Sequence, residues 1–216
     1  MSKSRPTLKS QWLLWSGALV GVCIGLYALP LFHIVPLRDA RRQSAADAFD
    51  AAAFVEKFWN DLLQKAATQS VDAGALLAAL SKDPGNAANR YGHRLGLSTT
   101  ASYLVSGHGR ITAVGKGFIE ITLEKGGTVV IDTGPVFGNA IRDGSGLLNV
   151  SHSPNSQSFN EISSKINARV EERVFPFLKQ KATVGTTVSF LGGVDIADGE
   201  KDISTLNLVP VVITFP

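Results

Sequence analysis

The sequence predicts an α+β protein: an N-terminal transmembrane helix, a short helical segment, and an OB-like five-stranded β-barrel with a helix between strands 3 and 4. Three observations lead to this prediction. An uncharged apolar run stands near the N-terminus, apolar residues then recur at helical spacing, and beyond residue 100 they alternate as in strands. We therefore expect a membrane anchor over 1–36, a linker and helical segment over 37–100, and the barrel domain over 101–216.

The apolar run, residues 12–35, is long enough to cross a bilayer. No Asp, Glu, Lys or Arg lies between Lys9 and Arg38, and about 20 helical residues span a hydrocarbon core. Pro30 and Pro36 are expected to end or kink the helix. We interpret the run as an uncleaved signal anchor.

Three alternatives to this anchor remain open. A cleaved signal peptide normally has a shorter apolar core and a small-residue cleavage site after it. A lipoprotein signal acylated at Cys23 needs a small residue where Val22 stands. The third alternative is a structural hydrophobic hairpin.

The charges that flank the run predict its orientation. Lys3, Arg5 and Lys9 predict a cytoplasmic N-terminus, although the arginines that follow the run weaken this bias. We expect a single-pass protein of the bacterial inner (cytoplasmic) membrane with its C-terminal domain in the periplasm.

Charge and cysteine content argue against several classes of function. The chain carries a formal net charge of +3, and residues 1–36 contain three basic and no acidic residues. The remaining basic residues equal the 18 acidic ones in number, so no excess charge supports a nucleic-acid partner.

Cys23 lies in the apolar run, which leaves no disulfide and no thiolate metal site in the rest of the chain. The histidines lack HxH and HExxH spacing, and we expect neither metal nor cofactor: His33, His93, His108 and His152.

Three helices are predicted before the barrel. The first, over 46–68, has an apolar face formed by residues at i and i+4 spacing. The second, over 72–81, begins with Asp72 as its N-cap and ends at the Asp83-Pro84-Gly85-Asn86 stretch. A short third helix is expected over 86–92. The apolar face of the first helix comprises Phe54, Val55, Phe58, Trp59, Leu62 and Leu63.

The barrel prediction depends on the order of its elements. Three strands come first, then a long loop over 134–158, a helix over 159–179 with Ser158 as its candidate N-cap, and two more strands. A helix between strands 3 and 4 is the element order of an OB fold. An unclassified α+β sheet domain remains the alternative. The predicted strands are Tyr103–Val114, Gly117–Leu123, Thr128–Thr133, Gly185–Ile196 and Leu206–Phe215.

The loop over 134–158 is rich in glycine, serine and asparagine, and it carries the candidate binding residues. We expect Asn139, Arg142, Asp143 and Asn155 to contact a ligand or partner, since loops on a rigid scaffold often bind and a guanidinium matches carboxylate or phosphate groups. The alternative is structural: an Arg142–Asp143 pair would pin the loop, and the polar residues from Asn155 on would cap the following helix.

Six segments resemble the bacterial DUF2291 proteins, which are predicted periplasmic lipoproteins or membrane-anchored proteins. They cover about residues 30–216, and the third is the most specific: PLFHIVPLRD, FDAAAFVEKFWNDLL, GPVFGNAIRD, NSQSFNEISSKIN, GTTVSFLGGVDI and PVVIT. Arg142, Asp143 and Asn155 match the family pattern, whereas Phe137, Asn139 and Ser156 depart from it. The resemblance implies a role beside sugar ABC-uptake systems.

We therefore expect a non-enzymatic accessory or binding module, held at the membrane by residues 12–35, whose partners are sugar ABC-transporter components or a small polar ligand. One alternative is a carbohydrate-acting enzyme that pairs Asp143 with Asp132 or Glu161, because such enzymes need two carboxyl groups across a cleft. The other is a structural interaction module that binds through 46–92. No residue is assigned a catalytic role.

Overall fold

The computed structural model describes residues 49–148, 155–200 and 203–216. Residues from Phe49 onward form one compact unit. The predicted anchor over 1–36 and the start of the linker lie outside the described residues. Within the described ranges, no helix is both long enough and apolar enough to span a membrane.

The strands of the domain form one sheet with the order β6-β4-β3-β2-β5-β7. Leu208 alone separates β6 from β7, so this last segment pairs with β4 at one end and with β5 at the other. The sheet thereby closes into the predicted OB-like barrel, and the parallel β4–β6 pair joins its third and last strands. The strands are β2 (Thr100–Val114), β3 (Phe118–Leu123), β4 (Thr128–Asp132), β5 (Thr187–Ala197), β6 (Thr205–Asn207) and β7 (Val209–Thr214).

Alternating apolar residues build the barrel interior. Ile119 pairs with Ile131 and Ile121 with Val129 across β3 and β4, and all four side chains are buried. Successive side chains of a strand point to opposite faces, so the intervening polar residues remain at the surface. Strand β2 is long enough to pair with both β3 and β5. A register irregularity after Ile111 helps it bend between the two partners.

Within residues 49–100, three helices precede the barrel, and their N-caps explain where they begin. Helix α3 (Ala51–Gln69) starts after Asp50, whose carboxylate accepts hydrogen bonds from the backbone N–H groups of the first turn. Helix α4 (Ala73–Lys82) confirms Asp72 as N-cap. Helix α5 (Pro84–Tyr91) begins two residues before its predicted start, because Asp83 caps it and a proline suits the first helical position.

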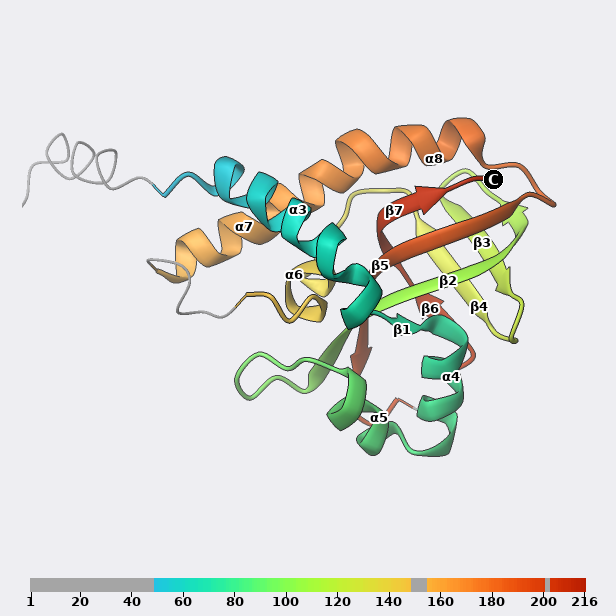
Figure 1. The fold of residues 1–216 in the computed structure, drawn as a ribbon, viewed down its shortest axis with the longest axis horizontal. Helices are drawn as coiled ribbons and strands as arrows, with labels where there is room; N and C mark the ends of the chain where they lie inside the picture. The colour runs from blue at the N-terminus through green and yellow to red at the C-terminus, as the bar shows by residue number, and fades with distance from the viewer. Residues whose placement is uncertain (1–48, 149–154, 201–202) are drawn as a thin grey trace, which may run out of the picture. The chain divides into compact units, whose positions relative to one another are not determined.

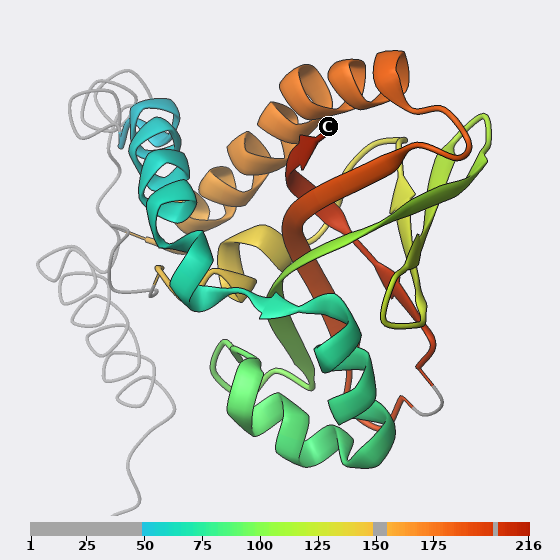
Figure 2. The same cartoon turned by 45° about the vertical axis from the view of Figure 1, so that its right-hand side comes forward.

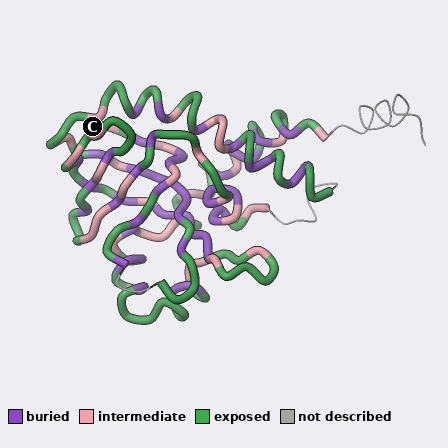
Figure 3. The backbone as a smooth tube through the Cα atoms, turned by 180° about the vertical axis from the view of Figure 1, so that it is seen from behind, coloured by how far each residue is buried: buried purple, intermediate pink, exposed green. Residues whose placement is uncertain are grey.

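The N-cap of α3 also corrects its predicted start at residue 46, since Phe49 and Asp50 are not helical. The short strand β1 (Val71–Asp72) follows α3 and pairs in parallel with β2. Leu76, Leu77 and Leu80 of α4 join the hydrophobic core of the barrel. The helical segment and the barrel therefore share one core, and the buried stretches of the chain gather in its interior (Figure 3).

The helix predicted over 159–179 consists of three consecutive pieces: α7 (Ser156–Arg169), the π-helical turn η2 (Val170–Val174) and α8 (Phe175–Lys181). Pro176 has no backbone N–H and its ring crowds the carbonyl four residues earlier. The helix widens just before it, where the N–H of Phe175 donates to the carbonyl of Val170, and such π-turns accommodate this kind of strain. Helices α3 and α7 lie side by side in two views (Figures 1 and 2).

The predicted N-cap Ser158 is wrong. The N-cap is Asn155, whose side-chain oxygen accepts a hydrogen bond from the N–H of Ser158 at 2.8 Å. Asn, like Ser, is a favourable N-cap, and the sequence NSQS offers both residue types. The register of the helix against the barrel decides between them.

The loop predicted over 134–158 also contains a short helix, α6 (Ala140–Gly144), which the sequence analysis missed. Helix α6 lies on β2 and β5 so closely that only glycines fit at the contacts. A Cβ atom on Gly193 would lie 2.5 Å from the carbonyl carbon of Ala140, and one on Gly144 would lie 2.7 Å from the carbonyl oxygen of Tyr103. Real Cβ atoms do not approach so closely, so both glycines are needed to seat α6 on the sheet.

Candidate functional site

Arg142 of α6 is a buried cation whose donors are occupied by the protein itself. Its side chain is 2% exposed. Its Nε and Nη2 atoms donate to the two carboxylate oxygens of Asp143 at 2.6 and 3.1 Å. Its Nη1 atom donates to Ser163 Oγ at 2.8 Å and to the carbonyl oxygen of Phe159 at 3.3 Å. Arg142 thus connects α6 to α7.

The surroundings of Arg142 compensate its charge from two directions. The guanidinium carbon lies 3.9 Å from the centre of the Phe159 ring, a distance at which a cation is attracted to an aromatic face. The planar fork of Arg suits the bidentate pairing with Asp143. This is the structural role that the sequence offered as an alternative to ligand contact. Ligand contact through Arg142 and Asp143 remains a prediction, and a buried Arg142 would act on a ligand only through its neighbours.

A groove of about 580 Å³ lies between the residues before α6 and one face of α7. The loop side of the groove is held by two bonds. The N–H of Val136 donates to Glu171 Oε1 at 2.6 Å, and Asn167 Nδ2 donates to the carbonyl oxygen of Gly138 at 3.1 Å. The groove is lined by Val136, Phe137, Gly138, Asn139, Asn160, Ser163, Ser164, Asn167, Ala168 and Glu171.

The chemistry of this groove is polar and almost uncharged. Glu171 is the one formally charged residue in its lining, and no lysine or arginine contributes. The three asparagine amides each offer donors and an acceptor. Ser163 Oγ already accepts a bond from Arg142, which leaves its hydroxyl hydrogen to point elsewhere. The groove therefore suits an uncharged ligand that both donates and accepts hydrogen bonds, and it offers no counter-charge to an anion.

Phe137 adds an apolar surface to this groove. Its side chain is 82% exposed, although a phenyl ring normally gains about 1.5–3 kcal/mol from burial. An exposed ring beside amide groups can pack against the apolar face of a polar ligand. In the sequence Phe137 is notable only as a departure from the family pattern, and the structure places it in the groove.

The four predicted contact residues do not share one surface. Asn139 lines the groove, and its side chain makes no capping hydrogen bond to α6. Arg142 and Asp143 lie behind the groove and support it. Asn155 caps α7 and is not part of the groove lining. Of the four residues, Asn139 is therefore the best placed to touch a ligand in the groove.

Asp195 of β5 is a site residue that sequence reasoning missed. The predicted strand Gly185–Ile196 contains Asp195 without assigning it a role, and the structure places it in β5, which packs against α6. Its Oδ1 atom accepts a hydrogen bond from buried Ser102 at 2.5 Å, and its Oδ2 atom faces Gly138. The neighbouring glycines at 192 and 193 were the available signal, since glycines in a strand indicate a close backbone approach.

Burial raises the pKa of the Asp195 carboxyl group, and the negative charge of Asp143 raises it further. The Ser102 hydrogen bond and the charge of Arg142 act in the opposite direction. Residue Asp195 as a whole is exposed, and its carboxyl group lies between buried Ser102 and Gly138 of the 136–139 loop.

The three carboxylates proposed for an enzyme lie in three different surroundings. Asp143 is paired with Arg142, Asp132 ends β4 as an exposed residue, and Glu161 is exposed on α7.

Within the part of the chain that the structure describes, no group of three His, Cys, Asp or Glu side chains is arranged to hold a metal ion. His108 bonds to Ser189 Oγ at 2.7 Å, and His33 and His152 lie outside the described residues.

Comparisons with known proteins identify a family and a fold. The family model for DUF2291, described as a predicted periplasmic lipoprotein, matches residues 22–214. The crystal structure of an OB-fold protein from Thermotoga maritima MSB8 is similar with a TM-score of 0.68 and 22% sequence identity, and the match covers 78% of this chain and 99% of that one. At this identity the likeness supports the OB fold alone. No curated protein matches the chain significantly.

Arg142→Met is expected to lower the free energy of unfolding by roughly 3–5 kcal/mol, because it leaves the carboxylate of Asp143 without its partner in a half-buried position. Chemical denaturation measures the loss. Arg173→Met is the matched control, since Arg173 is 62% exposed and should change stability little. The double variant Arg142→Met/Asp143→Leu should recover part of the loss, as apolar pairs can replace buried ion pairs. A single variant as stable as the control would contradict the supporting role of Arg142.

Asp195→Asn is expected to stabilise the domain at neutral pH. The folded-state pKa is raised above 3.8, so ionisation of Asp195 costs folded-state stability that the protonated form retains. The advantage of the variant should therefore disappear as the pH falls below the unfolded-state pKa. Urea unfolding of wild type and variant from pH 3 to pH 7 measures this.

Asp198→Asn is a control of opposite sign for the same titration. A side-chain hydrogen bond from Arg94 lowers the pKa of Asp198, so this variant should lose stability above the unfolded-state pKa and match wild type at low pH. Parallel stability curves for Asp195→Asn and wild type across the whole range would show that Asp195 is not desolvated in the fold.

Proposed function

The chain belongs to the DUF2291 family of predicted periplasmic lipoproteins, and from this premise we propose that it is a membrane-attached extracytoplasmic module that binds a small polar ligand in the groove between residues 136–139 and α7. The family description implies a place outside the cytoplasm and at a membrane. The groove is the single observation that carries the binding role, because the side chains of Asn139 and Asn160 line it and are at least partly exposed, while side-chain bonds from α7 and the turn after it hold its wall.

The groove supports this proposal through the rigidity of its wall. Binding costs less free energy when the site is already ordered. Here Arg142, Glu171 and Asn167 hold the loop before any ligand arrives. Asn139 and Asn160 remain available, since neither side chain is used to hold the loop in the described contacts.

The ligand class that best fits the groove is an uncharged sugar. Sugars present neighbouring hydroxyl groups that donate and accept hydrogen bonds, and their ring faces pack on aromatic side chains such as Phe137. We propose that the module acts without catalysis beside a sugar ABC-uptake system. That association is what the sequence resemblance implied, whereas the family description names only a predicted periplasmic lipoprotein. The absence of a basic residue in the groove lining supports an uncharged ligand.

We further propose that residues 12–35 attach the domain to the inner membrane as an uncleaved, single-pass helix, with the domain in the periplasm. The length of the apolar run supports this form of attachment, as does the branched Val22 before Cys23. The family description, which names a lipoprotein, favours the alternative in which Cys23 is acylated.

Uncharged sugars are expected to stabilise the purified full chain, and Asn139→Ala and Asn160→Ala should each weaken binding about tenfold, as expected for a lost hydrogen bond. Isothermal titration with glucose, xylose, ribose and maltose measures this, with glucuronate as the anionic comparison. Asn60→Ala is the matched control, because Asn60 is an exposed asparagine of α3 outside the groove. Equal binding by both groove variants and wild type would rule out this groove, and equal affinity for glucuronate would rule out the charge argument.

Cys23→Ala is expected to leave the mass of the membrane-bound chain unchanged apart from the substitution, because an uncleaved helix needs no lipid on Cys23. Intact-mass spectrometry and palmitate labelling in cells measure this. Val22→Ala is the matched positive control, since it places a small residue before Cys23 and should create a site for lipid attachment. Labelled wild type that loses its lipid in Cys23→Ala would establish the lipoprotein alternative.

A further inference from the structure

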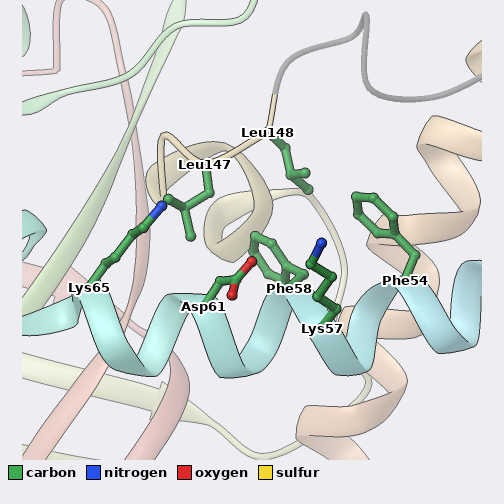
Figure 4. Close-up of a pocket in the computed structure, with 7 residues that line it drawn as sticks. All are labelled: Phe54, Lys57, Phe58, Asp61, Lys65, Leu147 and Leu148. Atoms are coloured by element: carbon green, nitrogen blue, oxygen red, sulfur yellow. The ribbon is translucent and has the colours of Figure 1, made fainter.

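A second pocket lies between α3 and the residues that follow α6 (Figure 4). Its volume is about 240 Å³. Apolar side chains form its base, and three charged side chains of α3 line one wall. The lining residues are Phe54, Lys57, Phe58, Asp61, Lys65, Leu147 and Leu148.

The three charges form a regular row. Lys57, Asp61 and Lys65 follow one another at intervals of four residues, so they lie on one face of α3 with neighbours about 6 Å apart and the two lysines about 12 Å apart along the helix. Their side chains extend from α3 toward the side where Leu147 and Leu148 lie (Figure 4). Among the salt bridges of the described residues, none involves these three side chains. The row therefore offers two positive charges with a negative charge between them, above an apolar base.

The position of α3 in the chain restricts what can reach this pocket. The apolar N-terminal segment ends near Pro36, and α3 begins at Ala51. The 14 residues of 37–50 span at most about 50 Å when fully extended. Helix α3 is consequently tethered near the membrane surface if the N-terminal segment attaches the chain to it.

We propose that this pocket binds the headgroup of a zwitterionic phospholipid of the phosphatidylethanolamine type, an inference that rests on the membrane attachment proposed above. The phosphate would lie between Lys57 and Lys65, and the ammonium group would donate to Asp61. The glycerol and the first methylene groups would pack on Phe54, Phe58 and Leu148. The lysine stems would cover the edge of this apolar contact, as lysines do at lipid interfaces.

This occupant fits the pocket better than a purely anionic or purely apolar one. An anionic headgroup would leave Asp61 facing like charge, and an acyl chain alone would leave three charges unmatched. A zwitterion supplies a phosphate for the lysines and an ammonium group for Asp61. The pocket should therefore prefer ethanolamine headgroups, whose ammonium hydrogens reach Asp61, over choline headgroups, whose methyl groups cannot donate to it.

Photo-crosslinking of the full chain in lipid vesicles tests the proposal. A photoreactive p-benzoylphenylalanine replaces Phe54 in vesicles that contain equal parts of phosphatidylethanolamine, phosphatidylcholine and phosphatidylglycerol, and mass spectrometry identifies the adducts. We expect mainly phosphatidylethanolamine adducts. Lys57→Gln and Lys65→Gln should each lower their yield about fivefold, as expected for loss of one lysine near a lipid surface. Asp61→Asn should remove the preference over phosphatidylcholine.

Two controls separate the pocket from general contact with lipid. Lys82→Gln removes an exposed lysine of α4 and should not change the yield. The same probe in place of Phe177, which is 43% exposed on α8, should capture lipid poorly and without preference. Equal capture from the two probe positions would overturn the pocket, as would adducts only with another protein or with residues 149–154 of the same chain.

Vesicle flotation keeps this failure distinct from failure of membrane attachment. A chain that floats with vesicles but forms no lipid adduct retains the attachment and loses the headgroup pocket. A chain that does not float overturns the attachment, and the pocket inference with it. Loss of sugar binding in the groove variants bears on neither result, because the groove and the pocket share no lining residue.

Discussion

The buried guanidinium of Arg142 imposes a requirement that organises the structure around α6. A charge removed from water is tolerated only where it is paired and hydrogen-bonded. Asp143, Ser163 and the carbonyl oxygen of Phe159 meet this requirement, and they come from two different helices. Satisfying one buried cation therefore joins α6 to α7 and gives the connection between the third and fourth barrel strands a defined course.

The second requirement is close contact between α6 and the barrel. Gly144 and Gly193 allow the backbone of α6 to touch β2 and β5, where any larger residue would force the layers apart. Asp195 lies two residues after Gly193 on β5, and burial raises the pKa of its carboxyl group. A strained or poorly hydrated group is tolerated when the surrounding structure holds it in place, and here the glycine contacts and the Arg142 bonds supply that support.

Both surfaces proposed to bind are built beside α6 and not on the barrel itself. The polar groove uses residues 136–139 before α6, and the α3 pocket uses Leu147 and Leu148 after it. OB barrels commonly bind ligands on the face of strands 2 and 3. A fold nevertheless hosts different functions through the loops and helices added to it. In this chain the barrel is the scaffold, and the helical insertion between its third and fourth strands carries the chemistry of the groove.

The order and type of the elements could be read from local patterns, because each pattern reports a local physical cause. Alternation predicted the strand Gly117–Leu123, in which Ile119 and Ile121 are buried, and Asp72 predicted the start of α4. Helical spacing predicted the apolar face of α3, of which Phe54 is only partly buried and Leu63 is exposed, whereas the other four residues are buried. The π-turn before Pro176 was not predicted, and the N-cap was expected at Ser158 although capping by the polar residues from Asn155 on was one of the alternatives, since several local solutions have similar free energies there. The contacts of each helix with the barrel select among them.

The candidate site depended more strongly on tertiary structure. The sequence by itself determined that Arg142 and Asp143 are neighbours in a glycine-rich stretch, and that they would either bind a ligand or pin the loop. Only the fold decided that Arg142 is buried, that Asn155 is a cap, and that Asp195 lies under α6. The physical reason is that burial, and with it the hydration and pairing of a charge, depends on residues distant in sequence. Gly193 is one such residue, because its close contact with α6 forms only when α6 packs on the sheet.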